Sequence, residues 1–224
     1  MAMCCYGRKL LLPILLVISH GVRAESQNLL VGLDLQSIRM ELQYPDAVRK
    51  TDLSSLDLLW YEPLNGWLDG SLKLGVVNDI TQSSNPIAAG QTLSGNSLGL
   101  GLRFHLYRSE RLSLHANLDY QYTDATVDQP GQSVEMRWHQ VRGQIEADIH
   151  LLQYSFLSFA AGAVSIDGDE RATGTVTSLQ TFTSDKPGFG RLGVKIGVDP
   201  TSHIVIEVSA GSIAGGRISF QRWF

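Results

Sequence analysis

The chain ends in Ile218-Ser219-Phe220-Gln221-Arg222-Trp223-Phe224, a stretch that alternates apolar with polar residues and finishes on phenylalanine. Side chains two residues apart share a face of a β-strand, so this pattern predicts a strand with one apolar and one polar face. About nine earlier segments alternate in the same way. Glycine is scattered along the chain and no apolar stripe keeps a period of 3.6 residues, so no long helix is expected. The sequence therefore predicts an all-β fold.

Some strands are better defined than others. In 97–107, Leu98, Leu100 and Leu102 alternate with glycine and charged residues. Equally regular segments are 66–77, 112–122, 135–151, 188–198 and 203–211. Segments 29–44 and 53–61 are the least regular, and 154–167 is apolar or small on both sides, so its facing stays open.

Two segments change phase along their length. Met136 and Trp138 are out of phase with the apolar residues that follow, which predicts a β-bulge near His139–Gln140. Ser37 marks a similar slip in 29–44.

The polar faces of these strands carry charges of both signs and histidine, and the apolar faces need something to bury them. A soluble β-sandwich or lipocalin-like barrel is the alternative, but lipid is the simplest partner for the apolar faces. Tight links at 62–66, 108–111, 153 and 200–202 alternate with longer ones at 45–52, 78–96, 123–133 and 167–187. The sequence predicts a transmembrane antiparallel up-and-down β-barrel of about ten strands, with eight as the fallback count and both termini in the periplasm.

The N-terminus has the features of a secretory signal peptide. Arg8 and Lys9 precede an apolar core at 10–18, which is too short for a spanning helix, and a small residue at Ala24 suits cleavage. We expect residues 1–24 to be removed, leaving 25–224 as one barrel domain. Both cysteines lie in the removed segment, so the mature chain would hold no disulfide.

Removal of the signal takes away three cations and no acids, so the formal charge of −4 becomes −7. A mildly acidic chain without a basic block argues against nucleic acid as a partner.

At this point the chain resembles the small outer-membrane β-barrel proteins of Gram-negative bacteria, over its whole mature length. The specific element is a C-terminal assembly signal, which Ile218, Phe220 and Phe224 match and from which Arg222 departs. The resemblance implies contact with outer-membrane lipid and lipopolysaccharide. It also implies assembly by periplasmic chaperones and the barrel-assembly machinery. This class includes pores, adhesins, lipid-modifying enzymes and proteases.

The inward-facing polar residues are the best candidates for function. Buried charges must pair, so they form either a salt-bridged plug or the lining of a narrow polar pore. The residues expected to line the lumen include Lys73, Arg103, His115, Asp119, Arg142, Glu146, Asp148 and Lys195. The same alternation also points Asp69, His105, Glu207 and Arg217 inward. The leading hypothesis is a non-enzymatic barrel, structural or narrowly pore-forming, with no cofactor and no metal.

Three alternatives remain open. Asp167-Gly168-Asp169-Glu170 could bind a divalent cation or form a plain turn. A lipid-modifying or proteolytic enzyme could be assembled from Ser, His and acidic residues on several strands, although His203 and Glu207 lie roughly 13 Å apart along one strand and cannot touch. An adhesin could act through the loops 78–96 and 167–187.

Overall fold

The computed structural model describes residues 29–82, 91–152 and 154–224. The predicted signal peptide at 1–24 lies outside this part of the chain. Among the described residues, no helix is long and apolar enough to cross a membrane. The strands are β1 (Leu30–Gln43), β2 (Val48–Asn65), β3 (Leu68–Gln82), β4 (Leu93–Arg108), β5 (Leu112–Gln129), β6 (Gln132–Leu152), β7 (Ser155–Gly174), β8 (Ser178–Ser184), β9 (Gly188–Gly197), β10 (Ser202–Gly211) and β11 (Ile213–Trp223).

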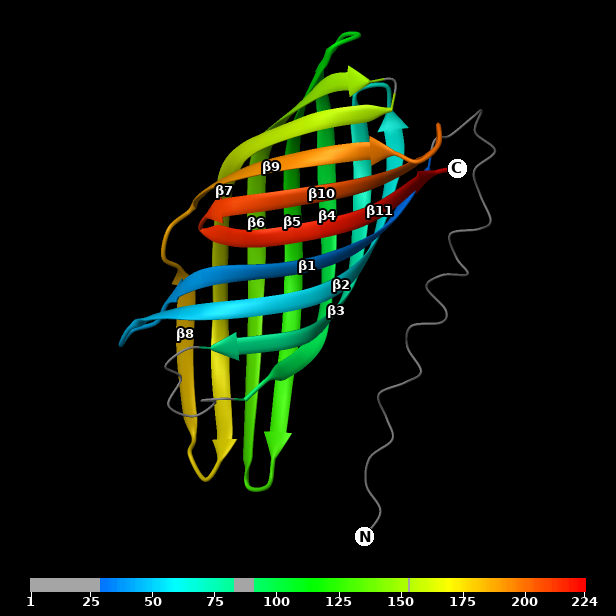
Figure 1. Cartoon of the computed structure of the whole chain (residues 1–224). Coiled ribbons are helices and arrows are strands. Elements are labelled where there is room, and N and C mark those ends of the chain that lie inside the picture. Colours follow the sequence, from blue (N-terminus) through cyan, green and yellow to red (C-terminus); the bar gives the residue numbers. More distant parts are fainter. Residues whose placement is uncertain (1–28, 83–90, 153) are drawn as a thin grey trace.

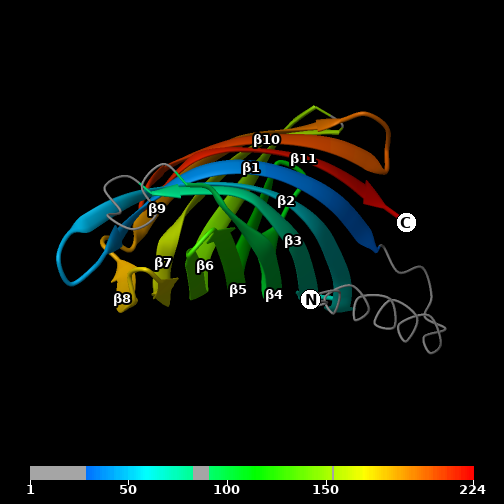
Figure 2. The ribbon, with the colours of Figure 1, turned by 90° about the horizontal axis from the view of Figure 1, so that it is seen from below.

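The strands form one antiparallel sheet that closes on itself (Figures 1 and 2). Neighbours in the chain are neighbours in the sheet from β1 to β7, and β11 pairs with β1 from Leu30↔Trp223 to Met40↔Ile213. Beside β1 and β11, Leu29 and Phe224 exchange backbone hydrogen bonds. The predicted antiparallel up-and-down barrel is therefore confirmed.

The barrel has a different circumference at its two ends. Two different strands pair with β7 on the side away from β6. β9 pairs with the first half of β7 and with β10, whereas β8 pairs with the second half of β7. Beyond the short β10–β11 hairpin, β8 reaches β1 at Leu42↔Ser184 and Gln43↔Thr183. Ten strands thus surround the end that carries Leu29 and Phe224, the termini of the described barrel, and eight surround the other end. Both predicted counts occur, at different levels of one barrel.

The turn of the β10–β11 hairpin is where the circumference changes. Gly211 adopts a φ of 106°, a left-handed conformation that favours glycine. Ser212 then donates from its backbone N–H to Gly188 O and from its hydroxyl to Pro187 O. On the other side, Asp185 N–H donates to Glu41 O. The segment between β8 and β9 therefore covers the end of the hairpin.

The predicted bulge near His139–Gln140 is wrong. The pairing of β6 with β5 is continuous from Gln132 to Ile149, and its pairing with β7 is continuous from Gln132 to His150. At Ser37, where the apolar pattern slips, β1 also keeps one register with β2 and β11. In both strands the facing of the side chains is constant, and what changes is the chemistry of each face.

This change of chemistry occurs at one level of the wall. On the half nearer the termini, outward side chains such as Leu100, Ile145 and Ile206 are apolar and exposed. Farther along, outward positions become polar in one hydrogen-bonded row, in which Asn96 pairs with Asp124, Asp124 with Arg137, and Arg137 with Asp169. At about the same level the inward positions of β6 switch from polar Gln140 to Trp138, which is buried.

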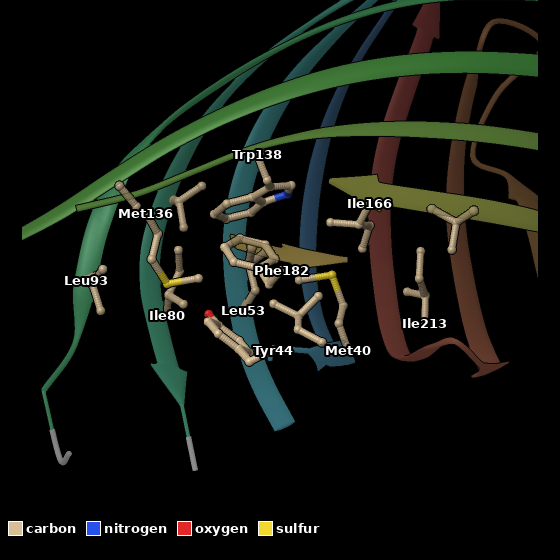
Figure 3. Close-up of a cluster of buried hydrophobic side chains, with 14 of the residues drawn as sticks. Met40, Tyr44, Leu53, Ile80, Leu93, Met136, Trp138, Ile166, Phe182 and Ile213 are labelled. Carbon is tan, nitrogen blue, oxygen red and sulfur yellow. The ribbon is translucent and has the colours of Figure 1, made fainter. Parts of the chain in front are cut away.

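The eight-stranded end encloses an apolar core (Figure 3). This core shows which face of segment 154–167 points inward. Val164 and Ile166 of β7 are buried in the core, whereas Phe159 points outward. In Figure 3, Phe182 lies in the middle of this cluster and Trp138 lies above it. The core is lined mainly by Met40, Leu42, Tyr44, Leu53, Val77, Ile80, Leu93, Met136, Trp138, Val164, Ile166, Phe182 and Ile213.

Two of the predicted long loops are mostly strand. β5 and β6 continue to a two-residue turn at Pro130–Gly131, where Gly131 has a φ of 81°. Segment 167–187 is occupied largely by β7 and β8, which pair from Asp167↔Thr183 to Ala172↔Ser178. Polar residues dominate the outward face of these hairpins, which is why they read as loops in the sequence. Inward side chains such as Ala172 and Phe182 hold them in the wall.

Truncation of Phe182 tests the apolar core. The change Phe182→Ala leaves a cavity in a well-packed cluster, so we expect the free energy of unfolding to fall by about 3–5 kcal/mol. The matched control is Leu179→Ala on the same strand, whose side chain is 62% exposed and should change stability little. The measurement is urea unfolding of the refolded protein in lipid vesicles. If both variants lost the same free energy of unfolding, Phe182 would not be part of a packed apolar core.

Candidate functional site

The ten-stranded half of the barrel has a polar interior. Each of its strands alternates outward apolar residues with inward polar ones, so a charged group projects inward from most of the wall. The eight residues named from the sequence lie at inward-facing positions on β3, β4, β5, β6 and β9, and each contacts a partner on another strand: Lys73, Arg103, His115, Asp119, Arg142, Glu146, Asp148 and Lys195.

Glu146 is the centre of this network. Its Oε1 lies 2.8 Å from Lys195 Nζ and 3.1 Å from Arg103 Nη2, and its Oε2 lies 3.0 Å from Arg191 Nη2. Asn117 also donates to Oε2, at 3.2 Å. Ser158 of β7 donates to Oε1 at 3.4 Å, so four strands besides β6, namely β4, β5, β7 and β9, donate to one anion whose side chain is 4% exposed. Such a site holds the wall together only while every partner is present.

The network extends toward the end that carries the termini. Lys195 Nζ also donates to Asp148 Oδ2 at 2.6 Å, and His115 Nε2 lies 3.9 Å from the same oxygen. The ring of His115 contacts the ring of His105 edge-on, with centroids 5.0 Å apart. His105 in turn bonds Asp69, with its Nε2 2.8 Å from Oδ2.

A second branch joins β11 to β1 and β10. Arg217 Nη1 lies 3.1 Å from Asp34 Oδ2, and Arg217 Nη2 lies 2.7 Å from Glu207 Oε2. Arg191 Nη1 approaches the same Glu207 oxygen at 3.5 Å, which connects this branch to Glu146.

Two further ion pairs complete the interior on the side of β2, β3, β5 and β6. Lys73 Nζ lies 3.1 Å from Asp57 Oδ2, and Arg142 Nε lies 3.3 Å from Asp119 Oδ2.

Three members of the network were not predicted from the sequence. Asp34 and Asp57 lie in 29–44 and 53–61, the two segments whose alternation is least regular. Arg191 precedes the alternating residues Leu192 and Val194, so the period of β9 could have identified it.

The polar interior contains three small adjoining cavities. Their volumes are about 60, 60 and 40 Å³. Arg142 and Arg217 border all three. Each is large enough to hold water, since about 10–15 Å³ of such space holds one molecule. Beyond the first cavity lies the apolar core, which fills the eight-stranded end.

One buried polar group interrupts the apolar core. The Tyr44 hydroxyl donates to Glu170 Oε2 at 3.0 Å and accepts from Gln82 Nε2 at 2.7 Å. The buried Arg49 guanidinium lies 4.0 Å from the centroid of the Tyr44 ring. Burial, reinforced by the Glu170 carboxylate, raises the pKa of Tyr44, so its hydroxyl stays protonated and continues to donate.

The structure also shows where residues of the alternative sites lie. Asp167 and Asp169 face outward from β7 while Glu170 faces inward, so the three do not converge. Among the described residues, no group of three or more His, Cys, Asp or Glu side chains could hold a metal ion. Ser113 Oγ and His150 Nε2 are 3.4 Å apart, but in the described part of the chain no carboxylate orients the His150 ring.

The predicted assembly signal lies on the outer surface. Ile218, Phe220 and Phe224 are exposed and face away from the lumen. The Arg222 guanidinium, which departs from the signal, lies 5.4 Å from the centroid of the Phe224 ring.

Comparisons with known proteins identify the fold. No protein-family model matches the chain, and no curated protein matches it. Among solved structures, the outer-membrane protease OmpT of Escherichia coli matches with a TM-score of 0.54 and 9% identity, over 90% of this chain and 96% of that one. The translocator domain of the autotransporter NalP from Neisseria meningitidis matches with a TM-score of 0.54 and 11% identity, over 94% of each chain. An outer-membrane channel from Pseudomonas putida F1 matches with a TM-score of 0.50 and 10% identity, over 90% of this chain and 97% of that one. The chain therefore has the fold of the small outer-membrane β-barrels of Gram-negative bacteria.

Proposed function

We propose that the protein is a non-enzymatic integral outer-membrane β-barrel with a closed lumen, and that its role is structural. The observation that carries this proposal is the filling of the interior at both levels. The ten-stranded half is crossed by the ion-pair network around Glu146, and the eight-stranded half is filled by the apolar core. An interior bounded by eight strands is just wide enough for side chains to fill it.

The outer surface supports a membrane position. The exposed apolar side chains form a band around the ten-stranded half, with Leu35 on β1, Leu100 on β4, Ile145 on β6, Val194 on β9 and Ile206 on β10. A water-soluble barrel would instead expose polar groups at these positions. Lipid and lipopolysaccharide are the partners that suit this band.

The lengths of the strands support an orientation. β6 has 21 residues, about twice the 9–11 that a spanning strand needs. The excess lies beyond the apolar band, on the side opposite Leu29 and Phe224, where β5–β6 and β7–β8 project (Figure 1). We place these hairpins outside the cell and both termini in the periplasm. The C-terminal residues Ile218, Phe220 and Phe224 would then serve recognition by the assembly machinery.

The first experiment is conductance of the refolded chain 25–224 in a planar bilayer. A filled lumen is expected to give no discrete current steps, because ions cannot cross the apolar core. Folding is verified on the same sample by the loss of β-structure on heating. Reproducible salt-dependent steps from folded protein would contradict the closed barrel and favour the narrow pore.

The membrane position is tested on β4. Leu100→Arg puts a charge in the middle of the apolar band and should lower the free energy of unfolding in vesicles by about 2–4 kcal/mol. Asn96→Arg on the same face, at the polar row, is the matched control and should cost about 0–1 kcal/mol. If the two changes had the same effect, the band would not lie in lipid.

The structural role of the network is tested at Glu146. Glu146→Gln removes the anion that Arg103, Arg191 and Lys195 share, and leaves three buried cations undercompensated. We expect a loss of about 3–5 kcal/mol in the free energy of unfolding. The control is Asp52→Asn, which breaks the exposed ion pair with Arg39 and should change stability little. A stable Glu146→Gln variant would show that the network does not hold the barrel.

A further inference from the structure

β8 has a neighbouring strand along the whole of one edge but along only a small part of the other. β7 pairs with it from Thr183 to Ser178. On the opposite side, β1 pairs only with Ser184 and Thr183. In the described part of the chain, residues 178–182 have no backbone partner on this side. Most of β8 therefore forms an open edge, at the margin of the projecting hairpins in Figure 1.

The contact with β1 shows which backbone groups this open edge offers. Asp185 N–H donates to Glu41 O, so the backbone groups of Asp185 point toward β1. In an antiparallel ladder the backbone groups of every second residue point to the same side, so those of Thr183, Thr181 and Leu179 point this way too. Thr183 lies in the ladder with β1. The N–H and C=O groups of Leu179 and Thr181 are left to pair with an added strand.

β1 itself cannot continue along this edge. It ends at Gln43, and the chain then turns back, with Tyr44 N–H donating to Ala47 O at 2.9 Å. In the register of the β1–β8 pair, the residue that would come opposite Thr181 is Pro45, which has no N–H to donate. The turn between β1 and β2 therefore leaves the edge open.

The sequence of β8 lacks the usual protection against strand addition. Natural proteins commonly place charges, proline or a bulge on an edge strand to prevent it from pairing. From Thr175 to Ser184 the chain has no charged residue, no proline and no glycine. Leu179 on this strand is 62% exposed. Such an edge is suited to pair with another extended segment.

The inward face of β8 holds the edge in position. Phe182 is buried in the apolar core, and Gln180 Oε1 accepts a hydrogen bond from Arg49 Nη2 at 3.0 Å. The strand is therefore extended and anchored before a partner arrives. Such preorganisation lowers the entropic cost of binding.

Two carboxylates lie beside the edge on the outer face. Asp167 and Asp169 of β7 lie opposite Thr183 and Thr181 of β8. Neither forms an ion pair with a residue that the structure describes, and the neighbouring Arg137 of β6 is paired with other carboxylates. A strand added to β8 would lie two strand spacings from β7, about 9.6 Å. The long, flexible side chain of a lysine at the position opposite Thr181 can reach toward these carboxylates.

The next outward position has a different character. Arg171 of β7 lies opposite Leu179 on the same face. A second basic residue here would be repelled by Arg171, whereas an apolar residue would pack on Leu179. The edge thus favours a segment in which a basic and an apolar residue are two positions apart.

A second copy of this chain does not fit the edge. Copies in one membrane have the same orientation, so a two-fold axis between them must lie along the membrane normal. Antiparallel pairing of two β8 strands needs an axis perpendicular to the barrel wall, which would invert one copy. Parallel pairing needs an axis along the strand, and strands of a barrel are tilted from its axis.

We propose that the open edge of β8 binds an extended segment of another polypeptide, which adds as a strand with a basic residue opposite Thr181 and an apolar residue opposite Leu179. This goes beyond the closed structural barrel. The proposed orientation only determines where the partner is met, namely outside the cell.

The test is fluorescence anisotropy of a labelled peptide titrated with the refolded chain 25–224 in non-ionic detergent micelles. The peptide has seven residues, with lysine at position 3, leucine at position 5 and threonine elsewhere, and its label is uncharged. We expect saturable binding with a Kd on the order of 0.1 mM. Glutamate in place of the lysine should raise the Kd at least about fivefold.

Backbone methylation of the peptide tests strand addition directly. Methyl groups on the nitrogens of positions 3 and 5 remove the N–H groups that face β8, and should raise the Kd at least about tenfold. The matched control has methyl groups at positions 2 and 4, whose N–H groups face away from β8, and should bind nearly as well as the parent peptide.

Variants of the protein test the same contacts from the other side. Thr181→Pro removes an N–H that the β7 ladder does not use, and should raise the Kd at least about fivefold. Thr181→Val keeps this N–H and is its control. Replacing both Asp167 and Asp169 by asparagine should raise the Kd about threefold, whereas Asp128→Asn on the distant β5 should not.

Four results would overturn the proposal: no saturable binding to folded protein, equal binding of the lysine and glutamate peptides, equal binding of the two methylated peptides, or normal binding by Thr181→Pro. If Thr181→Pro does not fold, the methylated peptides decide. Self-association that replaces peptide binding would overturn it in favour of a second copy. A conducting barrel would contradict the closed lumen but leave this edge unaffected, so the two proposals fail separately.

Discussion

Closure of the sheet by β1 and β11 is the constraint on which the rest of the structure depends. In hydrocarbon there is no water to satisfy an open strand edge, so every backbone N–H and C=O in the wall must find its partner in a neighbouring strand. The pairs from Leu30↔Trp223 to Met40↔Ile213 provide this along the whole of β11. They also bring Asp34 of β1 beside Arg217 of β11, so the closure of the backbone and one branch of the ion-pair network are formed together.

Once the wall is closed, the surroundings decide what each face carries. Where lipid surrounds the barrel, outward side chains are apolar and the interior collects the polar ones; where water surrounds it, the assignment is reversed. Both faces change at about the same level, between Gln140 and Trp138 inside and at the row from Asn96 to Asp169 outside. The step from ten strands to eight lies in the same region, where the pairing of β9 with β7 ends at Ala163 and that of β11 with β1 ends at Met40. A narrower circumference suits the apolar side, because side chains such as Trp138 and Phe182 can then meet across the interior and exclude water.

The sequence was sufficient for the facing of most strands, because facing is a local property with a period of two. It was misleading at Ser37 and at His139–Gln140 for a physical reason. A bulge that flips the side chains and an exchange of surroundings that flips their chemistry leave the same pattern in the sequence. Only the hydrogen-bond register separates them, and register belongs to pairs of strands. The pairing of β8 and β9 with different halves of β7 also depends on contacts between strands and cannot be read from one segment. The same holds for the convergence of Arg103, Arg191 and Lys195 on Glu146.

The junction of the two halves follows from these constraints. Charged side chains in the ten-stranded half need partners at hydrogen-bond distance, whereas the apolar core needs contact without polar groups, so neither kind of packing can continue into the other. A mismatch is therefore expected where they meet, and the first cavity lies there. The cations at its border are positioned by carboxylates elsewhere in the network. Arg217, for example, is held by Asp34 and Glu207 while its Nε remains without an acceptor. A lumen filled for stability thereby leaves a small space whose shape is fixed by the ion pairs on one side and by the apolar core on the other.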